Sequence, residues 1–236
     1  MAIGDIAGLK MGPATRDAFG DALVEIAASR PDIVVVDADL ANSTMASKFQ
    51  KAFPDRFIEV GIAESNMIGV AGGLASCGKQ AWATSFSAFL LANAYDQIRL
   101  SVAYPRLNVK LVGSHGGISI GPDGPSQMSI EDIALSCALP GFTVIFPSDA
   151  AQTKEAVRVA SETDGPFFIR TGRPKTPVLY ESGSAFTLGK ANTLREGNDV
   201  TLIACGLMVP LCLDAAALLA DIRAMQALLG DAAPAV

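Results

Sequence analysis

The sequence predicts an α/β fold, a mostly parallel sheet with helices on both faces. Short β-branched runs alternate with longer segments of helical periodicity, which is typical of strands joined by crossover helices. Each candidate strand is a continuous apolar run rather than an alternating one, as expected for strands that are covered on both faces. These two observations carry the fold prediction, and the short connections between most segments agree with it.

The predicted elements follow one another from the first helix, at residues 15–29, to a strand at residues 167–170. Pro31 and Asp32 end that helix before a strand at residues 33–36. Further strands are predicted at residues 56–60, 80–84, 109–113, 143–146 and 167–170, and helices between them at residues 63–76, 87–103, 130–139 and 149–161.

The C-terminal part of the chain is predicted to form a second, incomplete α/β domain. Residues 171–184 are rich in Pro, Gly, Ser and Thr, and regular patterning resumes only with a strand at residues 200–204 and a helix from about residue 209. We therefore expect one domain at residues 1–185 and a partial domain at residues 186–236, which is too short to bury a core of its own.

Composition excludes several classes of function. The net charge of −6, without a basic cluster, argues against a nucleic-acid partner. No run reaches the roughly 20 apolar residues of a membrane helix and no signal pattern opens the chain, so we expect a cytoplasmic protein without membrane contact. We expect buried thiols, and neither a redox pair nor a metal site, from the four scattered cysteines, Cys77, Cys137, Cys205 and Cys212.

A loop rich in Gly and Pro, at residues 114–129, is a candidate functional segment. His115, the only histidine, opens this loop after a predicted strand, and Asp123 lies within it. Ligands of open α/β folds bind at the carboxyl edge of the sheet, where His115 is expected to lie. A purely structural role for this histidine remains about equally open.

Two further segments combine chemistry with a strand-to-helix junction. Glu64 begins a predicted helix, where the helix dipole alone would favour a carboxylate. Phe86 and Phe89 share one face of a helix start and could stack a flat heteroaromatic ring, or simply pack in the core. Arg16 and Arg170 could each hold an anionic group through the guanidinium, or form surface ion pairs.

Taken together, these segments resemble the middle domain of transketolases and of the related deoxyxylulose-phosphate synthases. The resemblance covers approximately residues 10–215, with the segments in the order and spacing of the family. The matching stretches are VVVDADLANST, RFIEVGIAESNMIGVAGGLASCG, TSFSAFLLANAYDQIR, GSHGGISIGPDGPSQMSIED, FPSD and GPFFIR.

The resemblance implies a pyrimidine-binding domain for thiamine diphosphate. The family glutamate, here Glu64, hydrogen-bonds a ring nitrogen of the aminopyrimidine and assists deprotonation of the thiazolium carbon. Phe86 and Phe89 match aromatic residues that enclose the pyrimidine, and Asp39 is assigned with them to cofactor binding. A third aromatic residue, frequent in the family one turn later, is replaced by Ala92.

The resemblance also implies an anionic sugar substrate. His115, expected to be catalytic together with Glu64, and Asp123 match positions that contact sugar hydroxyls near the reacting carbon. A phosphate, or a sulfonate in its place, is expected to bind the residues that match the family's phosphate contacts, Arg16, Ser43 and Arg170. Gln127 stands where ordinary transketolases carry a histidine, which leaves the donor and acceptor sugars open.

A partner subunit is implied as well, because no segment resembles the family's diphosphate-binding motif, a Gly-Asp-Gly followed further on by Asn. We expect an N-terminal transketolase subunit to hold Mg²⁺ and the diphosphate, and the pyrimidine domains to associate with each other in an α2β2 heterotetramer. The predicted activity is transfer of a two-carbon ketol unit from a ketose, expected to be phosphorylated, to an aldose.

Three alternatives to this function remain open. A deoxyxylulose-phosphate synthase fragment and the β chain of a 2-oxoacid dehydrogenase share the fold and the glutamate, although His115 and the GPDGPS segment favour sugar chemistry. A non-catalytic regulatory relic is suggested by the short C-terminal part. The presence of Glu64, Phe86 and Phe89 argues against a relic.

Overall fold

The computed structural model describes residues 2–183 and 186–229, and its centre is a parallel sheet. Its six strands lie in the order β3-β2-β4-β5-β7-β6, and every neighbouring pair is parallel. The strands are β2 (Ile33–Asp37), β3 (Phe57–Glu59), β4 (Gln80–Phe86), β5 (Val109–Ser114), β6 (Thr143–Ile145) and β7 (Phe167–Arg170). The predicted fold class is confirmed.

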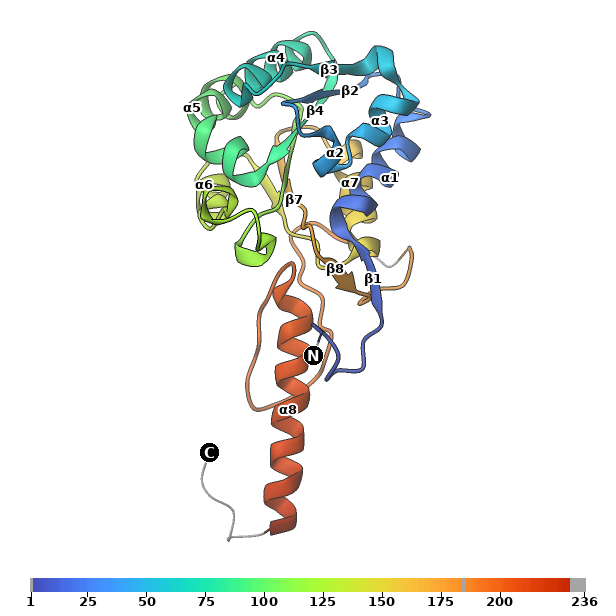
Figure 1. Cartoon of the computed structure of the whole chain (residues 1–236), viewed down its shortest axis with the longest axis vertical. Helices are drawn as coiled ribbons and strands as arrows, with labels where there is room; N and C mark the ends of the chain where they lie inside the picture. Colours follow the sequence, from blue (N-terminus) through green and yellow to red (C-terminus); the bar gives the residue numbers. More distant parts are fainter. Residues whose placement is uncertain (1, 184–185, 230–236) are drawn as a thin grey trace.

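Helices cover both faces of this sheet, as Figure 1 shows. One face carries α1 (Thr15–Ala27), α3 (Ser47–Ala52) and α7 (Ala150–Glu162). The other carries α4 (Glu64–Ser76), α5 (Tyr95–Ile98) and α6 (Asp132–Cys137), while the short α2 (Ala41–Thr44) follows β2. Short 3₁₀ turns lie at Pro54–Arg56, Ile118–Ile120 and Pro125–Gln127.

The continuous apolar character of the strands has a direct structural cause. Successive side chains point to opposite faces, so Val34 and Val36 pack toward α4 while Ile33 and Val35 pack toward α1. Trp82 on β4 is fully buried in the apolar cluster between the sheet and α1. Because both faces are covered, a polar residue in the middle of a strand would need a buried partner.

One predicted helix, at residues 87–103, takes a different form. The structure has π-helical turns at Phe89–Asn93 and Arg99–Ala103, separated by α5. A π turn holds more residues than an α turn, and such turns frequently occur at functional sites. The apolar pattern is compatible with either turn, so the prediction of a regular helix was wrong here.

The segment between the sheet and the last helix also differs from the prediction. Residues 200–204 form no strand, and Val200 and Ile203 are 67% and 89% exposed. An apolar run becomes a strand only beside another strand, and none pairs with these residues in the described chain. The sequence did not predict the antiparallel pair that β1 (Met11–Ala14) forms with β8 (Lys175–Pro177).

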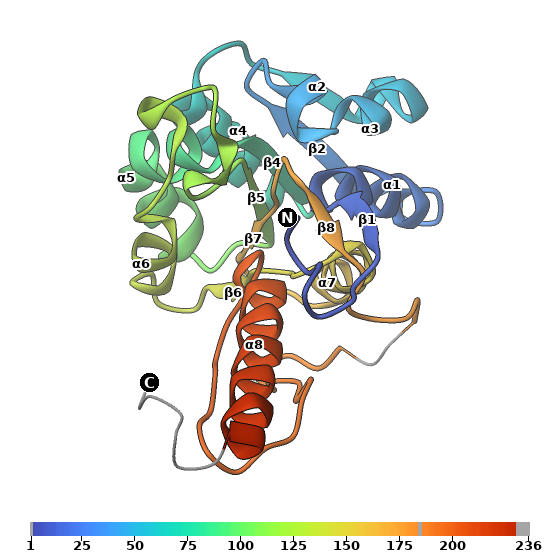
Figure 2. The same ribbon diagram turned by 60° about the horizontal axis from the view of Figure 1, so that its bottom comes forward.

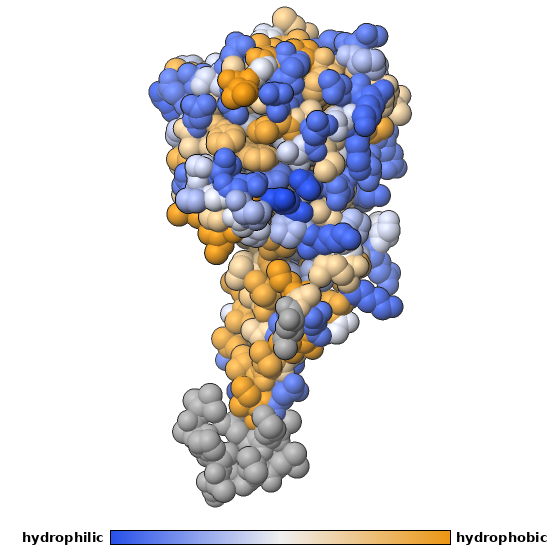
Figure 3. All heavy atoms as spheres, viewed as in Figure 1, coloured by the Kyte–Doolittle hydropathy of each residue, from blue (hydrophilic) through white to orange (hydrophobic). Residues whose placement is uncertain are grey.

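The last helix, α8 (Met208–Leu229), extends away from the sheet in both views of the ribbon (Figures 1 and 2). Asp214 joins it to the N-terminal segment by accepting hydrogen bonds from the backbone N–H groups of Gly4 and Ala7, at 2.7 and 2.9 Å. On the face shown in Figure 3 the described side chains of α8, at residues 208–223, are largely apolar, and Leu218 and Leu219 are about half exposed. No helix of the described ranges is both long and apolar enough to cross a membrane.

The prediction of buried thiols was wrong. Cys77, Cys137 and Cys205 are exposed and Cys212 is half-buried, and all four are free. Cys77 caps the C-terminus of α4 and Cys137 ends α6, so both lie where a helix meets solvent rather than in its buried face. The apolar residues beside these cysteines in the sequence gave no sign that they lie at helix ends.

The core should tolerate truncation poorly at the sheet and well at the surface. Phe19 of α1 is fully buried and its ring centroid lies 6.2 Å from that of Trp82. We expect Phe19→Ala to lower the free energy of unfolding by about 3–5 kcal/mol in urea titrations followed by circular dichroism. Tyr104→Ala is the control, because Tyr104 is 87% exposed and should change stability by less than about 0.5 kcal/mol. Equal effects of the two variants would contradict the packing described.

Candidate active site

The residues singled out from the sequence meet at the carboxyl edge of the sheet. From β2 the chain passes first to β3 on one side and then to β4 on the other, so the strand order reverses beside β2. Crevices at such reversals are the usual ligand sites of open α/β sheets. Phe86 and Arg170 are the last residues of β4 and β7, and His115 directly follows β5. Glu64 lies at the start of α4, after the loop that follows β3.

Glu64 is the first residue of α4 and its carboxyl group is almost completely buried, at 3% exposure. Its Oε1 accepts a hydrogen bond of 2.9 Å from the Ser85 hydroxyl at the end of β4. In the described part of the chain no donor contacts its Oε2. One oxygen is therefore fixed by the protein while the other is free to meet a ligand nitrogen.

Phe86, Phe89 and His115 form a continuous aromatic group. The rings of Phe86 and Phe89 are stacked with centroids 5.7 Å apart and planes inclined by 20°, and the His115 ring lies 4.1 Å from Phe86. A third ring inserted between the two phenylalanines would need about 7 Å, twice an ordinary contact distance. Contact with a pyrimidine stays a prediction, and in this arrangement it would use the outer ring faces.

The hydrogen bonds of His115 identify its tautomer. Arg16 Nη1 lies 3.3 Å from Nε2, and an arginine can only donate, so Nε2 is the acceptor. The proton then sits on Nδ1, which donates to the Ser114 hydroxyl at 2.7 Å. Burial, assisted by the positive charges of Arg16 and Arg173, lowers the pKa of His115 to about 4. The imidazole is therefore neutral at pH 7.

Arg16 connects the start of α1 to two other segments of the site. Its Nη1 donates to the backbone carbonyl of Ser43 at 3.0 Å as well as to His115. Its Nε is buried without a hydrogen-bond partner among the described residues. An unused buried N–H is costly, and an anionic oxygen of a ligand would satisfy it. The structure thus brings Arg16, Ser43 and His115 together, with Ser43 contributing its backbone.

Arg170 is engaged with protein groups. Its Nε lies 3.1 Å from Oδ2 of Asp132, which is fully buried and also accepts a hydrogen bond from Ser87 at 2.7 Å. Burial raises the pKa of Asp132 and lowers that of Arg170, while each charge opposes this effect on the other. The guanidinium packs against Gly116, where a Cβ would lie 1.9 Å from Nε. Contact of Arg170 with a phosphate stays a prediction.

Asp39 and Asp123 lie on the exposed rim of the site. Asp39 has a left-handed backbone with φ 61°, and its N–H donates to Glu59 Oε1 at 2.9 Å. Glu59 Oε1 also accepts from the N–H of Gly61 at 2.8 Å, so this carboxylate joins the two loops. Asp123 forms an ion pair of 3.2 Å with Arg173.

Sequence reasoning missed three residues of this edge. Asp132 and Arg173 pair with predicted residues, and Asp37, fully buried, accepts a hydrogen bond from the Thr84 hydroxyl and one from the Leu40 N–H. Burial raises the pKa of Asp37 to about 6. An aspartate that ends an apolar strand run was a signal that could have identified it.

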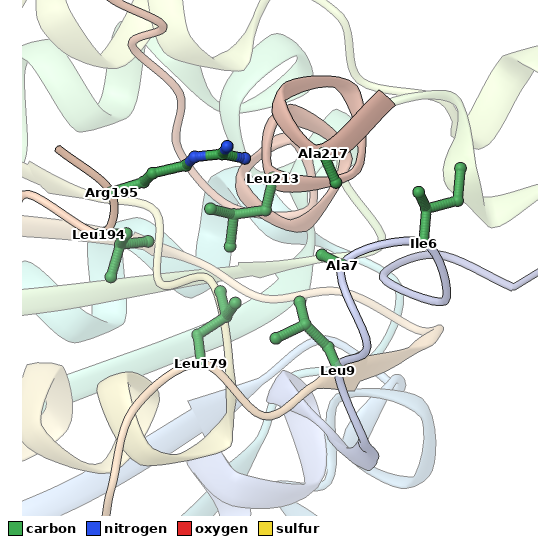
Figure 4. A pocket seen from close by; sticks show the side chains of 8 residues that line it. All are labelled: Ile6, Ala7, Leu9, Leu179, Leu194, Arg195, Leu213 and Ala217. Carbon is green, nitrogen blue, oxygen red and sulfur yellow. The ribbon is translucent and has the colours of Figure 1, made fainter. Parts of the chain in front are cut away.

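A cavity of about 390 Å³ lies elsewhere, between the N-terminal segment and α8 (Figure 4). It is lined by Ile6, Ala7, Leu9, Leu179, Leu194, Arg195, Leu213 and Ala217, none of which is a predicted site residue. The cavity is mainly apolar and is lined by no candidate acid or base, so the predicted site stays at the sheet edge.

The neutral state of His115 is directly measurable, because its ring signals are those of the only histidine. We expect an NMR titration to give a pKa near 4, and Arg16→Gln to raise that pKa by removing a nearby positive charge. Lys48→Gln, which removes an exposed ion pair with Asp21, is the control and should leave the titration unchanged. A pKa near the ordinary 6.5 would contradict the buried geometry.

The same shift has a defined effect on stability. Because the folded-state pKa lies below 6.5, the unfolded chain is protonated first, and the stabilisation is present above pH 6.5 and lost as the pH falls toward 4. Asp37 acts oppositely, since its raised pKa gives stabilisation that is present below pH 3.8 and lost as the pH rises through about 6. An NMR titration measures the pKa of His115 and that of Asp37 separately, whereas melting curves recorded at different pH values report the sum of their effects on stability.

The buried pair of Arg170 and Asp132 yields a second prediction. Arg170→Ala should lower the free energy of unfolding by about 3–5 kcal/mol, because the buried carboxylate of Asp132 loses its counter-charge. Adding Asp132→Asn should recover part of this loss, since the amide carries no charge to strand. Urea titrations of the two single variants and the double variant measure the coupling. Additive losses would show that the two side chains do not stabilise each other.

Comparison with known proteins identifies the family of this chain. The family model described as "Transketolase, pyrimidine binding domain" matches residues 11–178, and "Transketolase, C-terminal domain" matches residues 189–225. A putative transketolase C-terminal section of Methanocaldococcus jannaschii is 44% identical over 87% of this chain and 66% of its own length. The 6-deoxy-6-sulfo-D-fructose transketolase subunit SqwH of Clostridium sp. is 45% identical over 82% of this chain and 60% of its own length.

Solved structures give the same result. One described as "Split gene transketolase, inactive beta4 tetramer" has a TM-score of 0.81 and 45% identity, over 89% of this chain and 68% of that one. Transketolase from Campylobacter jejuni has a TM-score of 0.81 and 27% identity, over 90% of this chain and 34% of that one. The chain spans two thirds or less of the curated relatives named above. The chain belongs to the transketolase family, because the family model of the pyrimidine-binding domain matches more than half of its residues.

Proposed function

We propose that this chain is the pyrimidine-binding subunit of a thiamine-diphosphate-dependent transketolase. It would transfer a two-carbon ketol unit from an anionic ketose to an aldose, together with a separate N-terminal subunit. The observation that carries this proposal is the buried Glu64 carboxyl group, with one oxygen unused, beside the aromatic group of Phe86, Phe89 and His115.

These side chains fit the aminopyrimidine of the cofactor. An apolar ring face and a carboxyl oxygen without a partner complement a flat ring that carries nitrogen acceptors and donors. When bound, thiamine diphosphate supplies a carbanion-stabilising centre. Glu64 Oε2 would share a proton with a ring nitrogen, while Ser85 holds Oε1 in place at 2.9 Å. Burial of the Glu64 side chain limits the access of water to that proton.

His115 and Arg16 would orient the sugar. The imidazole is neutral, so it can exchange its bond to Arg16 for a bond to a sugar hydroxyl without the cost of burying a charge. The unused Nε of Arg16 then offers a charged donor close by. Asp123 lies on the rim of the same loop, where a hydroxyl of the substrate could meet it.

A partner subunit completes the proposal. We assign the diphosphate and Mg²⁺ to an N-terminal transketolase subunit, and association of two pyrimidine domains to an α2β2 heterotetramer. Two similar proteins are described as a C-terminal section and as a subunit, and a similar solved chain as an inactive β4 tetramer of a split transketolase. By analogy, this chain alone would associate with itself and remain inactive.

The substrate would be a phosphorylated ketose, with a sulfonated ketose as the second candidate. The sulfonate is considered because one relative is described as a 6-deoxy-6-sulfo-D-fructose transketolase subunit. Both groups are compact anions with several acceptor oxygens, which suits recognition by guanidinium groups.

Calorimetry tests the proposal. Thiamine diphosphate with Mg²⁺ is titrated into this chain alone and into its mixture with an N-terminal transketolase subunit from the same organism. We expect tight binding only in the mixture, because each chain supplies one wall of the site. Absence of binding in both experiments would contradict the proposal.

The role of Glu64 is tested in the same mixture. Glu64→Gln should keep cofactor binding within a few-fold and slow proton exchange at the thiazolium carbon by about 100-fold or more, because the amide cannot share the proton. Glu25→Gln, at an exposed position of α1, is the control and should exchange like the unaltered protein. Unchanged exchange in Glu64→Gln would remove Glu64 from this role.

A further inference from the structure

Asp132, the first residue of α6, is bonded to more than the guanidinium of Arg170. Its side chain is 1% exposed, and its Oδ2 also accepts a hydrogen bond of 2.7 Å from the Ser87 hydroxyl. Its Oδ1 accepts from the Ile133 N–H at 3.0 Å. A buried carboxylate is costly unless donors surround it, so the need to satisfy Asp132 holds each of these donors in place.

Ser87 lies in the short segment that joins the two aromatic rings of the site. It directly follows Phe86, the last residue of β4, and it precedes Phe89, the first residue of a π-helical turn. Ser87 is fully buried, and a Cβ at Gly113 of β5 would lie only 2.8 Å from its Oγ. The lack of a side chain at Gly113 therefore leaves the room that the Ser87 hydroxyl needs beside Asp132.

A second hydrogen bond joins the same region to α6. The Tyr95 hydroxyl donates to the carbonyl of Leu135 at 3.0 Å. Tyr95 follows the π-helical turn at Phe89–Asn93, whereas Ser87 precedes it. Their partners Asp132 and Leu135 are three residues apart, so they are neighbours on the surface of α6. The π-helical turn is thus bonded to α6 both before its first residue and after its last.

The bond of Ser87 bears directly on the aromatic rings. Between the two phenylalanines lie only Ser87 and Ala88, and of these only Ser87 has a polar side chain that can fix the segment. The rings of Phe86 and Phe89 stack with centroids 5.7 Å apart across it. Turns of the π type are rare and frequently lie at functional sites, which agrees with a role for this geometry in binding.

We infer that Asp132 and Ser87 are positioning residues, whose hydrogen bond fixes the Phe86 and Phe89 rings where the pyrimidine of the cofactor contacts them. This inference rests on the proposed function and adds two residues that touch neither cofactor nor substrate. The same bond determines the position of Phe86 beside the His115 ring, 4.1 Å away. Small displacements matter, because a binding site depends on supporting bonds that lock the side chains in contact with the ligand.

The first test needs neither cofactor nor partner. The ring current of Phe86 shifts the NMR signals of His115, the only histidine of the chain, so these signals report the position of the Phe86 ring. We expect Ser87→Ala to displace them in the full chain, which should stay folded by circular dichroism because Asp132 keeps its other donors. Ser87→Cys, which fills the space but donates only weakly, should displace them too.

Ser161→Ala is the matched control for this test. Ser161 is also buried, but its hydroxyl bonds only a carbonyl of its own helix, α7, so the His115 signals should stay in place. Unchanged His115 signals in Ser87→Ala or in Ser87→Cys would overturn the inference. The cysteine variant decides the matter where the alanine variant does not fold.

The second test uses the complex with the N-terminal subunit and thiamine diphosphate. Ser87→Ala should weaken cofactor binding about 3- to 10-fold in calorimetric titrations, the range for one aromatic contact. At saturating cofactor, proton exchange at the thiazolium carbon should match that of the unaltered complex, because Ser85 still holds Glu64. Unchanged affinity, or an equal loss of affinity and exchange, would overturn the inference. If the unaltered complex binds no cofactor, the proposed function fails, while the His115 signals still decide whether Ser87 positions Phe86.

Discussion

The arrangement of the molecule depends on one constraint: a parallel sheet covered by helices on both faces can carry polar chemistry only at the ends of its strands. Side chains in the middle of β2, β4 and β5 enter one of two apolar clusters, so an unpartnered polar group there would be destabilising. Lys110 shows what a buried polar side chain within a strand requires. It is fully buried near the amino end of β5, donates to the carbonyls of Thr163 and Gly165, and burial lowers its pKa to about 7. Polar groups that are not satisfied in this way collect at the carboxyl edge.

Burial at that edge decides which protonation states the site can use. The pKa of His115 is lowered and those of Asp37 and Asp132 are raised, and in each case burial is the largest cause because it disfavours the charged form. A neutral imidazole has fixed hydrogen-bond directions, since its donor and its acceptor nitrogen are each assigned by their neighbours. Arg16 makes Nε2 of His115 an acceptor, and the imidazole proton then points to Ser114. The burial that requires apolar side chains in the strands therefore also fixes the hydrogen bonds of His115 at the carboxyl edge.

Sequence reasoning was most successful where local pattern decides the outcome. Apolar runs predicted the six strands of the sheet, and the carboxyl-edge rule placed His115, whose ring contacts Phe86, at that edge. It failed where the outcome depends on distant partners. The run at residues 200–204 has the composition of a strand but no strand beside it, and residues 87–103 contain π turns that the periodicity does not distinguish from a regular helix. Pairings across the site, such as Arg170 with Asp132, also depend on contacts that no local window contains.

The Gly-rich loop shows how unequal burial makes two similar ion pairs differ in strength. Arg170 and Arg173 lie three residues apart, and both reach an aspartate, but Asp132 is 1% exposed and Asp123 is 35% exposed. Breaking the first pair would leave a buried charge without a partner or water, so we expect that pair to persist. Breaking the second returns both charges to solvent, so that pair contributes little to stability. Glycines at positions 116 and 117 permit the close approach of the buried guanidinium, because a Cβ on either would lie 1.9 or 2.4 Å from it. The loop is thereby anchored by Arg170, while the guanidinium of Arg173 stays solvent-accessible.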